Sequence, residues 1–342
     1  MIGLTDRPLA DQFGKRFDLG AAVSAVEWIG GQAWFACGDG VVRRLSADGT
    51  SADIAVHDGA ILCAAPGPDR RSLLTGGDDG RVVRVAADST TEELGHFGRH
   101  WVDHIIASPQ SGVIVAAVGK EAVVWKSGHR QPSHRYAFAS TIGGIALDAK
   151  GKRLAVTGYG GATLLYASAA DSARTILDWR GSHLQCTLSP DGAFLVSAMQ
   201  ETGLHGWKLP DKTDLAMSGY HGKTKSFSWS KRGKWLATGG HFSIVIWPFQ
   251  GKNGPMGGRA VTLGASSALV TRVAFNPQID VLAAGYADGS VNLLRLDDEG
   301  FASVEIAGGS AISALSWRDD GAVLAWGAED GRTGLLDMAR LP

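Results

Sequence analysis

One pattern recurs along almost the whole chain: an apolar strand, a turn often written Pro-Asp-Gly, and a second strand that ends in small residues. When one apolar position of the first strand is aligned, it falls at Val26, Cys63, Ile105, Ile145, Cys186, Phe227, Val273 and Leu315. Successive members differ by 37 to 46 in residue number. A period of about 40–45 residues with four short strands per unit is typical of a β-propeller.

The repeat predicts an all-β fold, a single eight-bladed β-propeller of four-stranded antiparallel blades. The units are expected at approximately 22–58, 59–99, 100–139, 140–181, 182–221, 222–268, 269–309 and 310–342. The last unit stops after its third strand, whereas the N-terminal segment 1–21 contains strand character at 14–20 and has no unit of its own. We therefore expect this N-terminal strand to pair into the last blade and close the ring, which hides exposed sheet edges. Seven blades is the alternative, because the early repeats are irregular.

The composition fits one propeller domain over residues 1–342. The 342 residues are 44% hydrophobic, and the 47 glycines suit many tight turns. The net charge of −1 provides no general attraction to nucleic acid or to an anionic membrane. No apolar run is long enough for a membrane span, and the N-terminus lacks a secretory signal. The three cysteines, Cys37, Cys63 and Cys186, fall inside expected strands and read as reduced core residues, so a cytoplasmic location is expected.

Several residues resemble the WD-repeat family of β-propellers. Trp125, Trp207 and Trp247 end third strands, where that family often has its tryptophan. Asp-Gly pairs stand between second and third strands at 39–40, 79–80, 288–289 and 330–331, and His57 and His221 precede first strands. The resemblance implies a structural tetrad of His, Ser or Thr, Asp and Trp in a blade. No unit has the whole set; the sixth comes nearest with His221, Thr238 and Trp247, but His241 takes the place of Asp.

No enzyme motif is present, so we expect a protein without catalytic residues or cofactor. The sequence contains no Gly-x-Ser-x-Gly elbow, phosphate-binding loop or His-Glu-x-x-His motif. The adjacent carboxylates Asp78 and Asp79 are explained by a turn. Several histidines fall in loops of one face, but they belong to different blades and do not form the three- or four-ligand set of a zinc site. No metal site is therefore predicted.

The aromatic residues that the repeat does not require are more informative. Connections from the fourth strand to the next first strand, and from the second strand to the third, emerge on one face; we call them the top connections. The surplus aromatic residues at these connections are Trp101, Tyr159, Trp179, Phe242, Tyr286 and Trp326. Because Trp and Tyr are enriched at the centres of protein interfaces, this set predicts a partner-binding face.

Polar residues of the first strands are expected to surround the mouth of the central channel. They are Asp103, His104, Gln185, Lys225 and Arg272. The opposite face carries basic turns, such as Lys150, Lys152 and Lys231, without stacking aromatic residues, so nucleic-acid binding is not expected. The leading hypothesis is a non-enzymatic scaffold or adaptor that binds a protein or peptide through the top connections. The alternative is a small-molecule or metal site at the channel mouth, with a possible hydrolase or lyase activity. Neither the partner nor the oligomeric state follows from the sequence.

Overall fold

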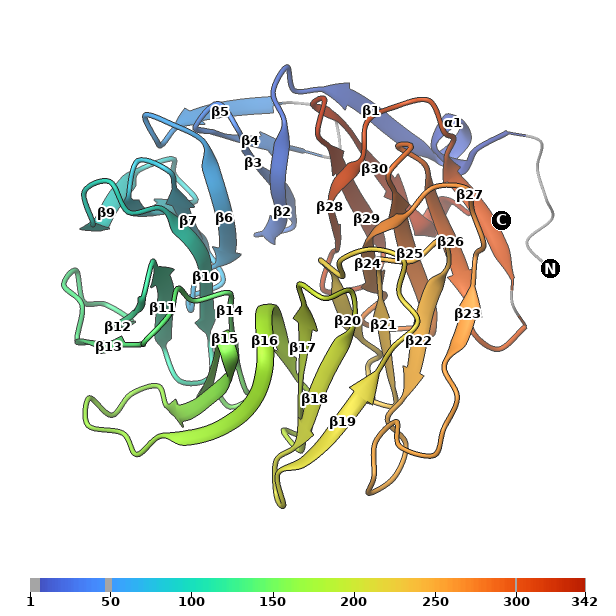
Figure 1. The fold of residues 1–342 in the computed structure, drawn as a ribbon. Helices are drawn as coiled ribbons and strands as arrows, with labels where there is room; N and C mark the ends of the chain where they lie inside the picture. Colours follow the sequence, from blue (N-terminus) through green and yellow to red (C-terminus); the bar gives the residue numbers. More distant parts are fainter. Residues whose placement is uncertain (1–6, 47–50, 299, 342) are drawn as a thin grey trace. The chain divides into compact units, whose positions relative to one another are not determined.

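The computed structural model describes residues 7–46, 51–298 and 300–341, and these residues form antiparallel β-sheets (Figure 1). They divide into two compact units. The first holds Met1–Phe35, Leu45–Ser51 and Gly219–Pro342, and the second holds Ala36–Arg44 and Ala52–Ser218. Residues 1–6 of the predicted closing segment lie outside the described residues. In the described part, the all-β propeller class with four-stranded antiparallel blades is confirmed.

Sheets built from the N-terminal and C-terminal parts of the chain belong to the first unit. One sheet contains β20 (Phe227–Trp229), β21 (Trp235–Thr238), β22 (Ile244–Pro248) and β23 (Val261–Leu263). The next contains β24 (Val270–Phe275), β25 (Val281–Tyr286), β26 (Val291–Arg295) and β27 (Phe301–Glu305). The last contains β28 (Ile312–Trp317), β29 (Val323–Ala328), β30 (Arg332–Asp337) and β1 (Gly14–Asp18).

The remaining sheets follow the chain from residue 23 to residue 217. The sheet of β2 (Val23–Ile29), β3 (Gln32–Cys37), β4 (Val41–Leu45) and β5 (Ser51–Ala55) has residues in both units. The second unit contains β6 (Ile61–Pro66), β7 (Ser72–Gly77), β8 (Arg81–Ala86) and β9 (Thr91–His96). It also contains β10 (Val102–Ser108), β11 (Val113–Val118), β12 (Glu121–Lys126) and β13 (His134–Ala137). Its third sheet has six strands: β14 (Gly144–Leu147), β15 (Arg153–Tyr166), β16 (Thr175–Leu188), β17 (Phe194–Met199), β18 (Leu204–Lys208) and β19 (Thr213–Met217).

The N-terminal strand completes the last sheet, as the sequence predicted. β1 pairs with β30 in antiparallel register from Gly14 opposite Leu336 to Asp18 opposite Arg332. Figure 1 shows β1 beside β30, although the two strands come from opposite ends of the chain. The first strand of the chain's first repeat, β2, also packs on β28, where the Trp28 indole N–H donates to the Ser316 carbonyl at 3.3 Å.

The main expectation of eight blades is not matched: the described residues form seven sheets, which was the alternative. The reason lies in the fourth and fifth predicted repeats, which share the six-stranded sheet. β15 folds back on itself, so that its two ends lie side by side. The N–H of Ala167, just after the strand, donates to the carbonyl of Lys152, just before it, at 2.9 Å. β16 then pairs with β15 through its first half and with β17 through its second half. No loop separates the two repeats, so the eightfold sequence pattern maps onto seven sheets.

The second strand of each repeat lies deepest. Every residue of β7, β11, β17 and β25 is buried. The Asp-Gly turns fit the same packing. Gly80 has φ of 78°, and a Cβ there would stand 2.3 Å from the carbonyl oxygen of Gly98. Only glycine meets both demands without strain.

The three cysteines lie within strands and form no disulfide, as expected. Burial raises the pKa of Cys37 to about 11 and that of Cys186 to about 12, and it also raises the pKa of Cys63. A thiol held in its neutral form is a poor nucleophile and a poor metal ligand. Among the described residues, no helix has the length and apolar character needed to cross a membrane. The α-helix α1 (Leu9–Phe13) packs on β27 and β30, and a short 3-10 helix, η1 (Met338–Arg340), follows β30.

Candidate functional site

Four of the six predicted top-connection aromatic residues are exposed. Trp101, Tyr159 and Trp179 belong to the second unit, and their exposed fractions are 58%, 69% and 38%. Trp101 directly precedes β10, Tyr159 stands at the bend of β15, and Trp179 stands where β16 passes from one repeat to the next. Starts of first strands and ends of second strands meet at the same end of an antiparallel sheet. Phe242, of the first unit, is 39% exposed.

The other two, Tyr286 and Trp326, are buried, so the sequence prediction that placed them on the surface is corrected. Tyr286 is fully buried in β25, and its hydroxyl donates to the carbonyl of Gly264 at 3.1 Å. Trp326 in β29 is 3% exposed and packs in the core between the last two sheets of the first unit. Neither side chain stands on the surface, so neither can serve as an exposed apolar anchor.

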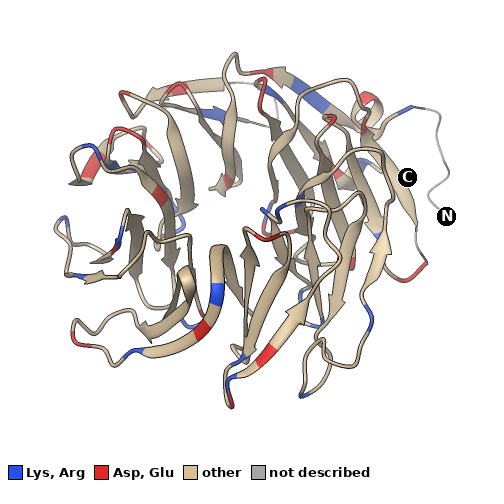
Figure 2. Ribbon diagram, in the orientation of Figure 1, with Lys and Arg blue, Asp and Glu red and all other residues tan. Residues whose placement is uncertain are grey.

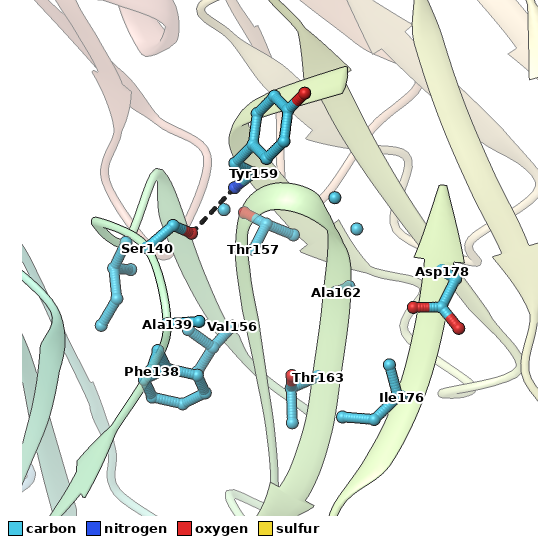
Figure 3. A pocket seen from close by; sticks show the side chains of 14 residues that line it. Phe138, Ala139, Ser140, Val156, Thr157, Tyr159, Ala162, Thr163, Ile176 and Asp178 are labelled. Carbon is cyan, nitrogen blue, oxygen red and sulfur yellow. Dashed lines mark hydrogen bonds between the residues drawn. The ribbon is translucent and has the colours of Figure 1, made fainter. Parts of the chain in front are cut away.

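Glycines at the bend of β15 place Tyr159 on the surface. Gly160 and Gly161 have φ of 92° and 136°. A Cβ at Gly161 would stand 2.1 Å from the carbonyl oxygen of Leu177, so the bend requires glycine there. The N–H of Tyr159 donates to the hydroxyl of Ser140 at 3.0 Å (Figure 3). This bond ties the bend to the segment that follows β13 and leaves the Tyr159 ring outside.

A pocket of about 150 Å³ opens beside this bend, entirely within the second unit. Its walls combine apolar groups, such as Phe138 and Ile176, with the polar groups of Ser140, Thr157 and Asp178 (Figure 3). Ile176 and Asp178 share one face of β16, because side chains alternate along a strand. The pocket therefore offers apolar contact together with one carboxylate and hydroxyl groups, a combination suited to part of a peptide or another small amphipathic group.

The opposite face of β16 supports Trp179. Its indole ring stacks on the imidazole of His205. His205 is 1% exposed and its Nε2 lies 3.1 Å from Asp214 Oδ1. Burial lowers the pKa of His205, and it also lowers the pKa of His183, whose Nδ1 lies 2.7 Å from the hydroxyl of Ser197. Neutral rings therefore support Trp179, and the half-exposed indole has a fixed orientation.

The predicted channel-mouth residues are divided between the units. Asp103, His104 and Gln185 are half-buried in the second unit. Burial lowers the pKa of His104, opposed by the charge of Asp103 and a hydrogen bond to the backbone of Gly143. Burial also raises the pKa of Asp103, opposed by His104. In the first unit Lys225 is exposed and Arg272 is half-buried.

Arg272 is held by hydrogen bonds to backbone carbonyls rather than by a direct ion pair. Its Nε donates to the Ser313 carbonyl at 2.6 Å and its Nη1 to the Thr271 carbonyl at 2.9 Å. Arg272 forms no ion pair within 4.0 Å with an Asp or Glu of the described residues; burial lowers the pKa of its guanidinium, and the charge of Glu329 opposes this shift. Burying a cation that has no direct ion pair is unfavourable, which makes Arg272 a candidate for binding an anionic group.

His221, His241 and Phe242 form an aromatic cluster, but its geometry does not favour a metal ion. The two imidazole centroids are 4.4 Å apart, and that of His221 lies 5.3 Å from the Phe242 ring. The N–H of Ser243 donates to His241 Nδ1 at 3.0 Å, so Nε2 of the neutral ring carries the proton and offers no lone pair. Within the described ranges, no three His, Cys, Asp or Glu side chains gather as metal ligands would.

The structural tetrads differ from those that the sequence indicated. In the sheet of β20 to β23, Tyr220 rather than His221 takes the central place: its hydroxyl lies 2.6 Å from Thr238 Oγ1 and accepts from the Trp247 indole at 2.7 Å. In the sheet of β6 to β9, His57 lies 2.9 Å from both Asp79 and Thr75. These groups satisfy one another and are structural. Sequence reasoning missed Tyr220 because the family's histidine stood in the next position.

Charged residues are scattered over each unit rather than gathered by sign (Figure 2). Many basic residues are paired, as in Arg84 with Asp69 and Arg153 with Asp148. The hollow beside Lys150 and Lys152 also contains Asp148 and Asp191 among its lining residues. This mixture gives little reason to expect a nucleic-acid interface.

Comparisons with known proteins agree with this architecture. A family model described as the anaphase-promoting complex subunit 4 WD40 domain matches residues 273–340. A model described as the WD domain, G-beta repeat, matches residues 51–83 and 215–248. Among solved structures, the crystal structure of a computationally designed protein, Ika8, is similar with a TM-score of 0.76 and 14% identity, over 94% of this chain and 97% of that chain. At that identity the likeness concerns the fold alone. No curated protein matches the sequence.

Proposed function

Because the chain belongs to the WD-repeat family of β-propellers, we propose that it is a non-enzymatic scaffold that binds a protein or peptide partner. Propellers of this family commonly serve as protein-interaction scaffolds. A fold alone does not assign a function, so the proposal must stand on the surface of this chain. Three cysteines without a disulfide are consistent with a reducing compartment, and we propose the cytoplasm.

The observation that carries the proposal is the exposure of Trp101, Tyr159 and Trp179 at the top connections of one unit. Large aromatic side chains gain most from leaving water, and Trp and Tyr dominate the binding energy of protein interfaces. Two of the three have fixed supports: the bend of β15 under Tyr159 and the ring of His205 under Trp179. A rigid surface loses little conformational entropy when a partner binds.

The pocket beside Tyr159 supplies the polar complement to this surface. Asp178 and the hydroxyls of Ser140 and Thr157 lie within one small hollow. We propose that a partner segment packs on the exposed rings and places a hydrogen-bond donor near Asp178. Phe242 is a separate candidate contact in the first unit.

The test compares quantitative affinity purifications from native cell extract. The variant Trp101→Ala/Tyr159→Ala/Trp179→Ala is compared with the control Tyr166→Ala/Ile279→Ala. Tyr166 and Ile279 are 58% and 52% exposed and do not stand at top connections. We expect the triple variant to lose specific partners that both the original protein and the control retain, with thermal unfolding showing that all three proteins are folded. Equal recovery of the same partners by all three would refute the proposed surface.

Arg272 favours a second candidate function, the binding of a small anion in the first unit. Its guanidinium donates to backbone carbonyls and forms no direct ion pair with a carboxylate of the described residues, although the charge of Glu329 acts on it. Thermal unfolding with added acetate or inorganic phosphate, in the original protein and in Arg272→Gln, tests this candidate. A concentration-dependent stabilisation that Arg272→Gln abolishes is expected, and Arg295→Gln, at a half-buried arginine paired with Asp298, is the control. No stabilisation by either anion would remove this candidate.

A further inference from the structure

One long stretch of the chain contains no acidic residue. Between Asp214 and Asp280 the sequence has eight Lys and Arg residues and neither Asp nor Glu. This stretch has a formal charge of +8 in a chain whose net charge is −1, so the rest of the chain stands at −9. The stretch contains the whole sheet of β20 to β23, which belongs to the first unit. That sheet is therefore the exception to the mixed charges of the protein.

Five of these cations lie at one end of the sheet. They stand in two connections, the turn from β20 to β21 and the insertion from β22 to β23, and all five residues are exposed. In an antiparallel sheet these two connections emerge at the same end. We call this end the basic end, and its cations are Lys231, Arg232, Lys234, Lys252 and Arg259.

Contacts hold the insertion against the turn. Where the insertion begins, the N–H of Phe249 donates to the carbonyl of Lys234 at 2.8 Å. Where it ends, Gly258 lies close to Pro248, the last residue of β22, because a Cβ at Gly258 would stand 2.8 Å from Pro248 Cγ. Gly258 directly precedes Arg259. The insertion thus begins and ends beside the turn, and the cations of both segments share one surface.

No carboxylate of the described residues pairs with the basic end within 4.0 Å. The Lys231 ammonium donates to the amide oxygen of Gln278 at 3.1 Å, which is a neutral partner, and Asp280 in the turn after β24 pairs with none of the five cations. Other turns of the protein differ, as where Arg43 pairs with Asp39 four positions away. Like charges that are not compensated repel one another, and a partner that brings carboxylates relieves this repulsion.

The aromatic residues near the basic end are packed inward. Phe249 is 6% exposed and packs edge-on against Trp229, with ring centroids 4.7 Å apart, and Trp235 is half-buried. Surfaces for single-stranded nucleic acid combine cations with exposed rings on which bases stack, and the described part of the basic end has no exposed aromatic ring. Met256 of the insertion, 49% exposed, offers a flexible apolar contact instead. These features favour an acidic polypeptide over a nucleic acid.

We propose that the basic end binds an acidic segment of a partner protein, in which several Asp or Glu side chains lie close together along the chain. Carboxylates of the segment pair with the cations of the turn and of the insertion at the same time. At physiological ionic strength charges act over about 8 Å, so neighbouring cations attract the segment together. The inference rests on the proposed function, partner binding, but assigns it a surface separate from Trp101, Tyr159 and Trp179.

The test measures how a fluorescein-labelled peptide of alternating glutamate and serine binds to the full chain, by fluorescence anisotropy. We expect saturable binding that weakens as sodium chloride is added, because salt screens exposed charges. Lys231→Gln/Arg232→Gln/Lys234→Gln should weaken binding by about tenfold, the loss of three exposed ion pairs of ordinary strength. Thermal unfolding checks that this variant is folded; should it not fold, Lys252→Gln/Arg259→Gln replaces it, with an expected loss of about fivefold.

A matched control separates the position of the cations from their number. Lys120→Gln/Lys150→Gln/Lys152→Gln removes the same charge from exposed positions of the second unit and should leave binding unchanged. The triple alanine variant of the top connections should also bind the peptide normally, so failure of that surface and failure of the basic end are distinguishable. The proposal is overturned by absent or salt-insensitive binding, by equal weakening in the control, or by tighter binding of single-stranded oligothymidylate of the same charge.

Discussion

The indole of Trp179 stacks on the imidazole of His205, with ring centroids 3.8 Å apart and an interplanar angle of 13°. His205 in turn packs edge-on against Trp207, with a centroid distance of 4.6 Å. The exposed ring is therefore the outer layer of a stack that reaches the core of its sheet. The protonation state of His205 therefore affects the ring that supports Trp179.

The protein should become less stable as the pH falls, because His205 is buried in its neutral form. Burial lowers the pKa of His205 from its ordinary 6.5 to about 4. Above pH 6.5 the ring is neutral in both states; as the pH falls from 6.5 to about 4, the unfolded chain takes up a proton that the folded protein does not. The free energy of unfolding should therefore drop in this window, by on the order of 1–2 kcal/mol from this residue.

Urea unfolding across this pH range checks the effect in the original protein and in His205→Gln. The variant should show a shallower dependence on pH, whereas His129→Gln, at an exposed position, should keep the original slope. Identical slopes in all three proteins would show that His205 does not carry the effect.

The buried carboxyl of Glu27 should have the opposite effect and make the protein less stable as the pH rises. Burial, with a smaller effect of the charge of Asp319, raises the pKa of Glu27 from 4.5 to about 8. Below pH 4.5 the carboxyl is protonated in both states; between 4.5 and about 8 only the unfolded chain ionises, so the folded state loses stability as the pH rises. Glu27→Gln should be more stable by about 1–3 kcal/mol at pH 8 and nearly equal at pH 4.5. Chemical denaturation at both pH values decides this, and a constant difference would contradict it.

Removal of the Tyr220 hydroxyl should destabilise the sheet of β20 to β23. Trp247 donates to this hydroxyl, which lies in hydrogen-bond contact with Thr238. Tyr220→Phe leaves the Trp247 indole without its acceptor and should cost about 1–2 kcal/mol of unfolding free energy. Tyr159→Phe, which removes a hydroxyl from an exposed ring, should change stability by less than about 0.5 kcal/mol. Equal effects of the two variants would show that the buried hydroxyl is not structural.

A methyl group at Gly334 should disturb the packing of Trp326. The added Cβ would stand 2.1 Å from the ring, so the indole or the strand must move, at a cost of about 1–3 kcal/mol. Gly203→Ala is the matched control, because the nearest atom to its added Cβ is 3.7 Å away. Thermal unfolding of the two variants compares them, and a fully stable Gly334→Ala would show that this contact is not tight.

The comparison of sequence and structure is clearest where one residue decides the outcome. The sequence placed His221 in the tetrad of its repeat, but the structure uses Tyr220, since the direction of a side chain changes with every step along an extended chain. Tyr286 and Trp326 also looked like surplus surface residues. Each is buried in a second strand, and the sequence contains no signal for the glycine opposite Trp326.

The sequence by itself determined the fold class, because the repeated pattern of apolar strands and Asp-Gly turns is local. All eight aligned positions lie in strands, and β1 fills the place left open in the last sheet. Only the tertiary structure decided that two repeats share one sheet, which aromatic rings remain exposed, and that the turn after β20 and the insertion before β23 lie together. These outcomes depend on contacts between residues far apart in the chain, and a local pattern does not contain them.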